Sequence, residues 1–238
     1  MAIELFSSGF FGDANLVAYY RFLTGALITD SKGSFTLTNN NTVGETASGK
    51  FGYASDFSAT NSNKSLTITN DLGITGGACT LNCWVKNLAE IGADAWGYVH
   101  QQDGGIYVVN QIFYDYNGGT RRLVFDRTRN FVANNRVYHT ITMGTTDWYM
   151  LTMTYDTANV RGYVNGDEVG TPAASSGNGT TAGVDRGIVG AAAGSDGTLA
   201  YYASSQIDDV AVFTRALSAS EISRLYLSSA KSLFFQQI

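Results

Sequence analysis

The sequence predicts an all-β protein made of two facing antiparallel sheets, a β-sandwich, with one short C-terminal helix. Glycine occurs 27 times and proline once. The glycines separate short runs rich in valine, threonine and tyrosine, which is the pattern of many strands joined by turns. Of the 238 residues, 44% are hydrophobic, enough to bury one large core. No internal repeat or linker divides the chain, so we expect an N-terminal arm (1–14), one domain (15–228) and an apolar C-terminal tail (229–238).

Short strands are expected along the whole domain. They cover residues 16–22, 35–39, 51–57, 65–69, 78–86, 96–101, 106–115, 121–126, 137–143, 148–155, 159–165, 167–171, 186–192 and 206–213. Asn165-Gly166 is the strongest turn signal, because both central positions of a tight hairpin turn favour positive φ. So many short strands do not pack as one open sheet, and they are therefore expected to form two sheets packed face to face.

The most diagnostic segment is QIDDVAVFTRALSASEISRLY, near the C-terminus. Residues 207–213 alternate with apolar side chains on both faces, which is typical of a buried strand. Ser218 and Glu221 have the spacing of a capping box, in which each side chain satisfies a backbone donor of the first helical turn. Apolar residues at helical spacing follow, and they predict a single helix over about 218–228.

This closing segment resembles the strand–helix motif of the laminin-G-like, concanavalin A-like jelly rolls. Four further segments are similar to that family in the same order along the chain: a first strand at 16–22, GKFGYASDF at 49–57, TLNCWVK at 80–86, and a hairpin over 148–170 that contains YVNG. The resemblance implies a jelly-roll sandwich. It also implies a binding module, because members of the family are mostly binding modules rather than catalysts.

Composition argues against nucleic-acid and membrane partners. The net charge is −5 and only 15% of residues are charged, whereas a duplex-binding surface needs a basic stripe. The basic cluster at 121–129 is interpreted as solvated strand ends. No segment has the apolar length needed to cross a bilayer. Residues 1–6 show neither the basic flank nor the apolar region of a secretion signal, although the resemblance implies an extracellular or surface location.

Known catalytic patterns of related folds are missing from the sequence. A laminarinase-type hydrolase would carry Glu-x-Asp-x-Glu on one strand, and the five glutamates here are scattered. An alginate-lyase-type jelly roll needs Gln-x-His, and Gln111-Ile112-Phe113 lacks the histidine. No Gly-x-Ser-x-Gly elbow occurs either. We therefore expect no enzymatic activity, and a carbohydrate-active enzyme with an unrecognised site remains the alternative.

Candidate sugar-binding residues lie on the expected strand at 96–101 and at the tip of the hairpin that follows it. Alternation along residues 96–100 predicts three rings on one strand face, and a second group is expected at the tip of the following hairpin. The candidates are Trp96, Tyr98, His100, Tyr114, Tyr116, Asn117 and Arg122. Together they could line a shallow groove. The alternative is that loops cover such rings as a second small core, an interpretation favoured for Trp84 and Trp148.

Asp30 and Asp208 are the candidate metal ligands. Asp30 lies in the loop after the first strand, and Asp208 lies on the closing strand, where the family often has an Asp near that loop. Some relatives hold calcium at the sandwich rim with such carboxylates, and calcium takes about six to eight oxygen ligands. The alternative is that Asp208 only accepts hydrogen bonds from the loop backbone.

Together these features predict a non-catalytic subunit that binds carbohydrate or another surface ligand. We expect it to be displayed on a phage virion or another extracellular particle, and to contact neighbouring subunits through the N-terminal arm and the C-terminal tail. The alternative for the arm and the tail is an extra edge strand on the sandwich. The rival hypothesis is a purely structural assembly or decoration subunit that has no ligand of its own.

Overall fold

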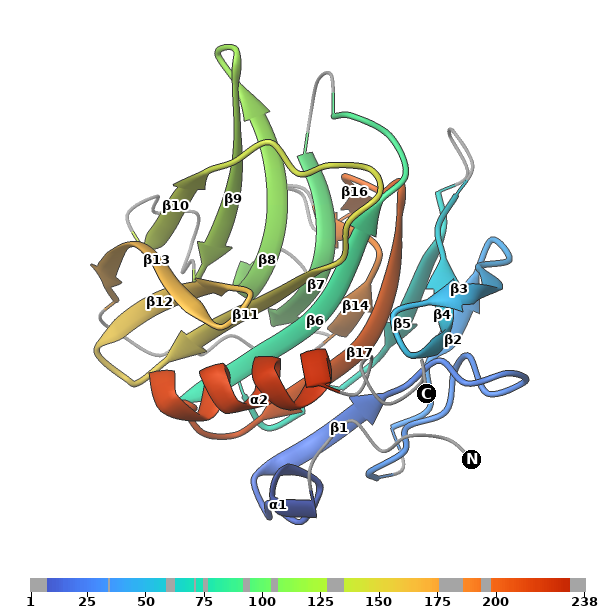
Figure 1. The fold of residues 1–238 in the computed structure, drawn as a ribbon, viewed down its shortest axis with the longest axis horizontal. Helices are drawn as coiled ribbons and strands as arrows, with labels where there is room; N and C mark the ends of the chain where they lie inside the picture. The colour runs from blue at the N-terminus through green and yellow to red at the C-terminus, as the bar shows by residue number, and fades with distance from the viewer. Residues whose placement is uncertain are drawn as a thin grey trace.

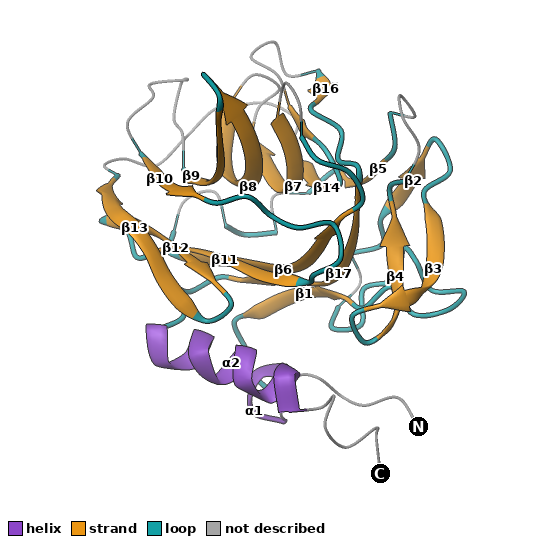
Figure 2. Ribbon diagram, turned by 45° about the horizontal axis from the view of Figure 1, so that its top comes forward, coloured by secondary structure: helices purple, strands orange, loops and turns teal. Residues whose placement is uncertain are grey.

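The computed structural model describes residues 8–33, 35–58, 63–70, 72–74, 77–91, 95–103, 107–127, 135–175, 186–193 and 198–231. These residues form two antiparallel sheets that face one another (Figures 1 and 2), so the predicted β-sandwich is confirmed. Helix α2 (Ala219–Lys231) lies along the outer face of one sheet, and the short α1 (Ser8–Phe11) lies on the same side. None of the helices in these ranges combines the length and apolar character that crossing a membrane takes.

The sheet next to α2, here called the helix-side sheet, has eight strands. Their order is β13-β12-β11-β6-β17-β4-β3, with β1 also paired to β17. The strands are β1 (Leu16–Tyr20), β3 (Gly44–Gly49), β4 (Gly52–Asp56), β6 (Cys79–Asn87), β11 (Tyr149–Tyr155), β12 (Asn159–Val164), β13 (Asp167–Ala174) and β17 (Ser205–Phe213).

The opposite sheet, here called the helix-free sheet, has seven strands in the order β10-β9-β8-β7-β14-β5-β2. They are β2 (Thr38–Asn40), β5 (Ser65–Ile68), β7 (Ala95–Asp103), β8 (Tyr107–Asn117), β9 (Thr120–Asp126), β10 (Arg136–Thr140) and β14 (Arg186–Val189). A separate short ladder joins β15 (Ala192–Ala193) to β16 (Leu199–Ala200).

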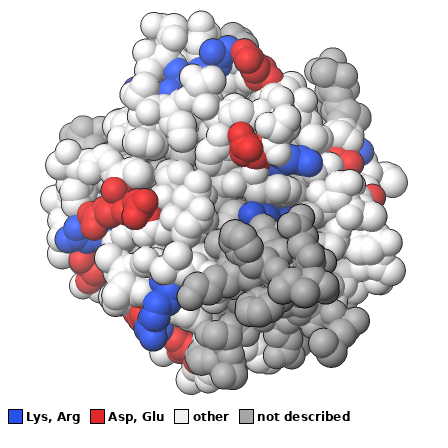
Figure 3. All heavy atoms as spheres, in the orientation of Figure 1, with Lys and Arg blue, Asp and Glu red and all other residues white. Residues whose placement is uncertain are grey.

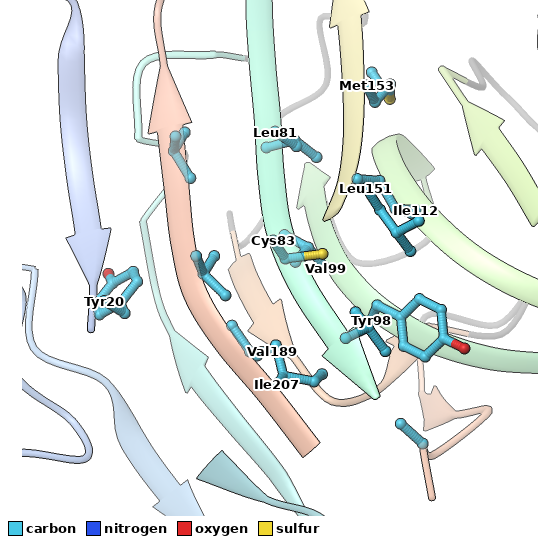
Figure 4. Packing of buried hydrophobic residues seen from close by; sticks show 14 of the residues in the cluster. Tyr20, Leu81, Cys83, Tyr98, Val99, Ile112, Leu151, Met153, Val189 and Ile207 are labelled. Atoms are coloured by element: carbon cyan, nitrogen blue, oxygen red, sulfur yellow. The ribbon is translucent and has the colours of Figure 1, made fainter. Parts of the chain in front are cut away.

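The main core fills the space between the two sheets (Figure 4). Leu81 and Cys83 of β6 and Leu151 of β11 point inward from the helix-side sheet, and Val99 and Ile112 meet them from the helix-free sheet. All five are at most 4% exposed. Burial of these side chains is the main favourable contribution to folding.

A second, smaller core lies between the helix-side sheet and α2. Trp84 is 3% exposed, and its ring stacks on Tyr226 of α2 with ring centroids 5.9 Å apart. Phe51 meets the same indole edge-on at 5.6 Å, and Trp148 packs partly buried against the cluster. Both tryptophans therefore belong to a second core, the interpretation favoured from the sequence, although helix α2 and not only loops covers Trp84.

The capping box at the start of α2 is confirmed. Glu221 Oε2 accepts a hydrogen bond from the Ser218 backbone N–H at 2.8 Å, and Ser218 Oγ accepts one from the Glu221 N–H at 3.3 Å. Arg215 donates to both Glu221 (2.7 Å) and Asp13 (2.6 Å), and hydrogen bonding to this guanidinium lowers the pKa of Glu221 to about 2. These contacts tie the chain just before β1 to the start of the helix.

The predicted Asn165-Gly166 turn is also present, with φ of 53° and 91° between β12 and β13. Other boundaries differ from the prediction. Strand β3 was not predicted, because its largely exposed residues lack an apolar alternation. Helix α2 continues to Lys231, so the start of the predicted tail (229–238) is helical. Residues 1–7 of the predicted arm and 232–238 of the tail lie outside the described residues.

Charges on the helix-side face are mixed in sign. Figure 3 shows acidic and basic side chains side by side among uncharged ones, without an extended basic stripe on the described part of this face.

Gly162 on β12 allows the two sheets to approach closely. A Cβ at this position would collide with the ring of Phe125, a buried residue of β9. We expect Gly162→Ala to lower the free energy of unfolding by about 1–3 kcal/mol, because the ring must shift within a packed core. Urea denaturation would measure the change. As a control, Gly77→Ala, where a Cβ meets no atom within 4 Å, should stay within about 0.5 kcal/mol of the parent. Equal midpoints for the two variants would contradict this account.

Candidate functional site

Strand register determines which side chains of the helix-free sheet face outward. Successive residues of a strand point to opposite faces, and Ile112, Leu123, Phe125 and Val137 all lie in the main core. The residues between them on β8, β9 and β10 therefore lie on the outer face, away from α2 (Figure 2). This outer face is the candidate functional site, because the outer face of the other sheet is covered by α2.

An exposed aromatic ring lies on this outer face. Tyr138 of β10 is 43% exposed, and the Arg122 guanidinium carbon lies 4.4 Å from its ring centroid. Arg122 donates from Nε and from Nη2 to Asp115 Oδ2, at 2.9 and 2.8 Å. The carboxylate fixes the guanidinium and the guanidinium supports the ring, so these three side chains form a preorganised surface.

A row of polar side chains crosses four strands beside Tyr138. The cross-strand partners are His100 with Gln111, Gln111 with Asp126, and Asp126 with Arg136. His100 Nδ1 lies 3.0 Å from Gln111 Oε1, Gln111 Nε2 donates to Asp126 Oδ2 at 2.8 Å, and Arg136 Nε donates to the same oxygen at 3.0 Å. We call these four residues the polar row.

The polar row runs from the interior to the surface. His100, Gln111 and Asp126 are 1%, 6% and 0% exposed, whereas the Arg136 side chain is 29% exposed. Burial lowers the pKa of His100 to about 4. Burial also acts to lower the pKa of Arg136, but the charge of Asp126 and a hydrogen bond to Tyr138 outweigh burial and raise the pKa of Arg136 above its ordinary value. The exposed end of the row is thus a charged guanidinium next to the Tyr138 hydroxyl.

A crossing segment, residues 190–193 and 198–203, covers the β7 end of the outer face. Gly97 donates its N–H to the Tyr201 carbonyl at 2.8 Å, and Gly190 donates to the Tyr98 carbonyl at 2.9 Å. A Cβ on Gly97 would collide with the backbone of residues 191 and 192. Glycine at this position therefore lets the segment lie directly on β7.

The structure separates the seven predicted ligand-binding residues. Tyr98, His100 and Tyr114 are at most 1% exposed, so the predicted open groove containing these rings is wrong. The face that carries Trp96, Tyr98 and Tyr114 is the inward one, and a β-bulge between Gly97 and Val99 places His100 on the opposite face. Tyr98 consequently enters the main core together with Val99, and its hydroxyl donates to Asn87 Oδ1 at 2.7 Å.

The other four predicted residues do not form one cluster. Trp96 and Tyr116 are half-buried and pack against the main core, and Asn117 is exposed at the end of β8. Only Arg122 lies beside Tyr138 on the outer face. The ligand-binding role of these four residues stays a prediction.

Sequence reasoning missed Tyr138, Asp115 and Arg136. Part of the signal was available, because the core residue Val137 stands between Arg136 and Tyr138, so these two neighbours are expected on the opposite face of the strand. What the sequence does not contain is the pairing of β10 with β9, which places Tyr138 next to Arg122.

Asp30 acts as an acceptor for the backbone that follows β1. It is 7% exposed and accepts N–H hydrogen bonds from Tyr19 (2.8 Å), Lys32 (2.9 Å) and Phe35 (3.3 Å). This explains why the loop folds back onto β1. Calcium at this position stays a prediction.

Asp208 has a similar role on β17. It is fully buried and accepts hydrogen bonds from the backbone N–H of Phe51 at 3.2 Å and of Asp209 at 2.9 Å, as the alternative interpretation expected. Within the ranges that the structure describes, no group of three or more His, Cys, Asp or Glu side chains is arranged to hold a metal ion. A metal-binding role for Asp208 stays a prediction.

Asp209 lies beside Asp208 in a β-bulge of β17 and has a φ of 47°. Burial raises the pKa of Asp209 to about 7, although the Tyr19 hydroxyl donates to it at 2.9 Å and opposes the rise. Burial and the neighbouring Asp209 charge also raise the pKa of Asp208. The two carboxyls therefore disfavour ionisation of one another within the fold.

Asp209 makes folding sensitive to pH in a defined direction. Its folded pKa exceeds its unfolded value, so its stabilising contribution is full below about pH 4 and is lost as pH rises through about 7. We expect Asp209→Asn to stabilise the protein at pH 8 by on the order of 2–4 kcal/mol. It should also flatten the dependence of unfolding free energy on pH between 4 and 8. As a control, Asp147→Asn replaces an exposed carboxyl, and its unfolding free energy should depend on pH as that of the parent does. A variant less stable than the parent at pH 8 would refute this reasoning.

The architecture defines a class, the two-sheet jelly roll with a helix on one side. Residues 59–223 match the laminin-G-like family model described as the concanavalin A-like lectin/glucanases superfamily. Because this match covers more than half of the chain, the protein belongs to that superfamily, and the resemblance found in the sequence is confirmed. No curated protein matches the chain.

Several solved structures share the fold. Domain 4 of AbnA, an extracellular GH43 arabinanase from Geobacillus stearothermophilus, in complex with arabinotriose, has a TM-score of 0.60 at 17% identity. The match covers 89% of this chain and 98% of that one. The binding domain of botulinum neurotoxin DC, in complex with SialylT, has a TM-score of 0.65 at 14% identity and covers 91% and 52%. The receptor-binding domain of botulinum neurotoxin type G has a TM-score of 0.57 at 16% identity and covers 90% and 51%. The chain thus spans about half the length of the toxin domains.

Proposed function

We propose that the protein is a non-catalytic carbohydrate-binding module that holds its ligand on the outer face of the helix-free sheet. The observation that carries the proposal is the exposed Tyr138 ring, stacked on an Arg122 guanidinium that Asp115 fixes with two hydrogen bonds. Binding sites for small polar molecules combine an apolar surface with a few well-placed polar groups, and this surface has both.

The arrangement suits a sugar for two physical reasons. A tyrosine ring offers a flat apolar surface with a polar tip, against which the C–H groups of a sugar ring can pack. The guanidiniums of Arg122 and Arg136 are donors only, and sugar hydroxyl oxygens accept such hydrogen bonds. Since both arginines are already held by carboxylates, little side-chain freedom is lost on binding, which favours affinity.

The comparisons are consistent with this proposal. One neighbour in fold was solved in complex with arabinotriose and another in complex with SialylT. These ligands belong to those proteins, and they suggest which probes to use on this one.

Binding is favoured over catalysis because of how the carboxylates of the outer face are engaged. Asp115 accepts two hydrogen bonds from Arg122, and Asp126 is fully buried and accepts from Gln111 and Arg136. A hydrolase needs two carboxyls free to exchange protons or attack the sugar. Carboxyls held in ion pairs are suited to positioning.

We further propose that the protein is displayed on a phage virion or another extracellular particle, with neighbouring subunits contacting the N-terminal arm and the C-terminal tail. Helices α1 and α2 lie on the side opposite to the outer face (Figure 2). Phe11 of α1 and Leu227 of α2 are 42% and 49% exposed and offer apolar contacts there. Subunit contacts on this side would leave the sugar-binding face accessible. A purely structural subunit would instead bury the outer face against its neighbours. Calcium at Asp30 or Asp208 is a separate proposal, and it would make ligand binding sensitive to chelators.

A glycan array run with and without chelator, followed by titration calorimetry with the best-bound glycan and with arabinotriose, tests the proposal. We expect Tyr138→Ala to weaken binding at least about tenfold, because it removes the stacking ring. As a matched control, Tyr53→Ala removes another exposed ring, 38% exposed on β4 of the other sheet, and should bind as the parent does.

Undiminished binding by Tyr138→Ala would place the site elsewhere. No glycan signal, together with a large oligomer in mass photometry, would favour the structural subunit. Turnover of a polysaccharide would instead establish an enzyme.

A further inference from the structure

The polar row has a single direction of hydrogen bonding. Asp126 is an acceptor when ionised, and its Oδ2 receives both Gln111 Nε2 and Arg136 Nε. The Gln111 amide must therefore present its oxygen to His100, because the flipped amide would place that oxygen against the carboxylate. His100 must in turn carry its proton on Nδ1 in order to donate to Gln111 Oε1 at 3.0 Å.

This polarity leaves His100 Nε2 as an unprotonated acceptor. Nε2 is buried and has no hydrogen-bond partner among the residues that the structure describes. Leaving a buried acceptor unsatisfied costs about 1–3 kcal/mol, so a purely structural element would be expected to avoid it. The neutral ring also agrees with the low pKa that burial gives His100.

Arg136 gains a fixed orientation from the row. Its Nε is held by Asp126, and its guanidinium carbon lies 5.9 Å from the Phe113 ring centroid, so the plane of the fork is restrained from two sides. The guanidinium also makes a hydrogen bond with the Tyr138 side chain, and the Arg136 side chain is 29% exposed. Because Asp126 engages Nε, the terminal nitrogens, Nη1 and Nη2, are the donors best placed to meet a ligand. A guanidinium held in this way presents a directed pair of donors, which a lysine cannot reproduce.

We propose that His100, Gln111 and Asp126 are positioning residues. They hold the Arg136 guanidinium in one orientation beside Tyr138, so that its terminal N–H groups meet acceptor oxygens of the bound glycan. The inference rests on the proposed function and deepens it, because it assigns Arg136 to the ligand and three buried side chains to the orientation of Arg136. The ligand atom at this position must be an acceptor, a hydroxyl or carboxylate oxygen.

The first experiment determines the tautomer of His100 and the exchange protection of the Arg136 Nε–H in the parent protein, without any ligand. The chain has only two histidines, so ¹⁵N-detected imidazole spectra, with His139→Gln for assignment, give the state of His100 directly. We expect His100 as the Nδ1–H tautomer, neutral from pH 8 down to about 5, and an Arg136 Nε–H signal protected from exchange. An Nε2–H tautomer, or titration of His100 near the ordinary value of about 6.5, would overturn the proposal.

The second experiment couples the row to binding. Gln111→Leu should weaken binding of the best-bound array glycan about tenfold, and Arg136→Lys should weaken it by a similar factor because it keeps the charge and loses the fork. The double variant should bind no more weakly than either single variant, since both act on one interaction. His139→Gln is the matched control and should bind as the parent does.

The outcomes separate this inference from the proposed function. If the affinity losses of the two single variants multiply in the double variant, Gln111 does not act through Arg136. The proposed glycan-binding site would still stand in that case. A parent protein that binds no glycan would end the proposed function and with it the binding role of Arg136. Should Gln111→Leu fail to fold, the tautomer and the Arg136 signal of the parent protein still decide whether the row orients the guanidinium.

Discussion

Strand β17 is the constraint on which the rest of the structure depends. It is hydrogen-bonded to β6 on one edge and to β1 and β4 on the other, and all nine of its residues are buried. Val210 and Val212 enter the main core, whereas Ala211 and Phe213 enter the smaller core under α2. Because the capping box and Arg215 follow directly, this strand also sets where α2 lies. The helix then covers one sheet, and the outer face of the other sheet remains for a ligand.

The features that could be predicted from the sequence are those determined by neighbouring residues. The alternation that places Leu81 and Cys83 in the core repeats every second residue, so it can be recognised without knowing any partner strand. The capping box needs only Ser218 and Glu221, three positions apart, and the turn at Asn165-Gly166 needs only two residues. Such local signals, in a consistent order, were sufficient for the fold class and the family.

The candidate site could not be predicted, because it depends on pairings between distant segments. The face that carries Trp96 and Tyr98 is the inward one, and a bulge at Gly97 places His100 on the other face, since a shift of one residue exchanges the two faces of a strand. The polar row takes one residue from each of four strands, and nothing in the sequence aligns His100 with Gln111 or Asp126 with Arg136. Exposure of Tyr138 likewise depends on which face α2 covers. Burial of the Asp209 carboxyl was likewise not predicted, because aspartate is ordinarily found at the surface.

The pairing of β1 with β17 also affects the order of events during protein synthesis. Leu16 is hydrogen-bonded across from Phe213, so the ribosome completes nearly the whole domain before the first strand can find its neighbour. Until then the nascent chain carries open strand edges on β1, β4 and β6, which are the kind of surface that promotes aggregation. Closure of the sandwich is accordingly a late, long-range event and a slow one. Those edges therefore stay exposed to other chains until translation has passed β17.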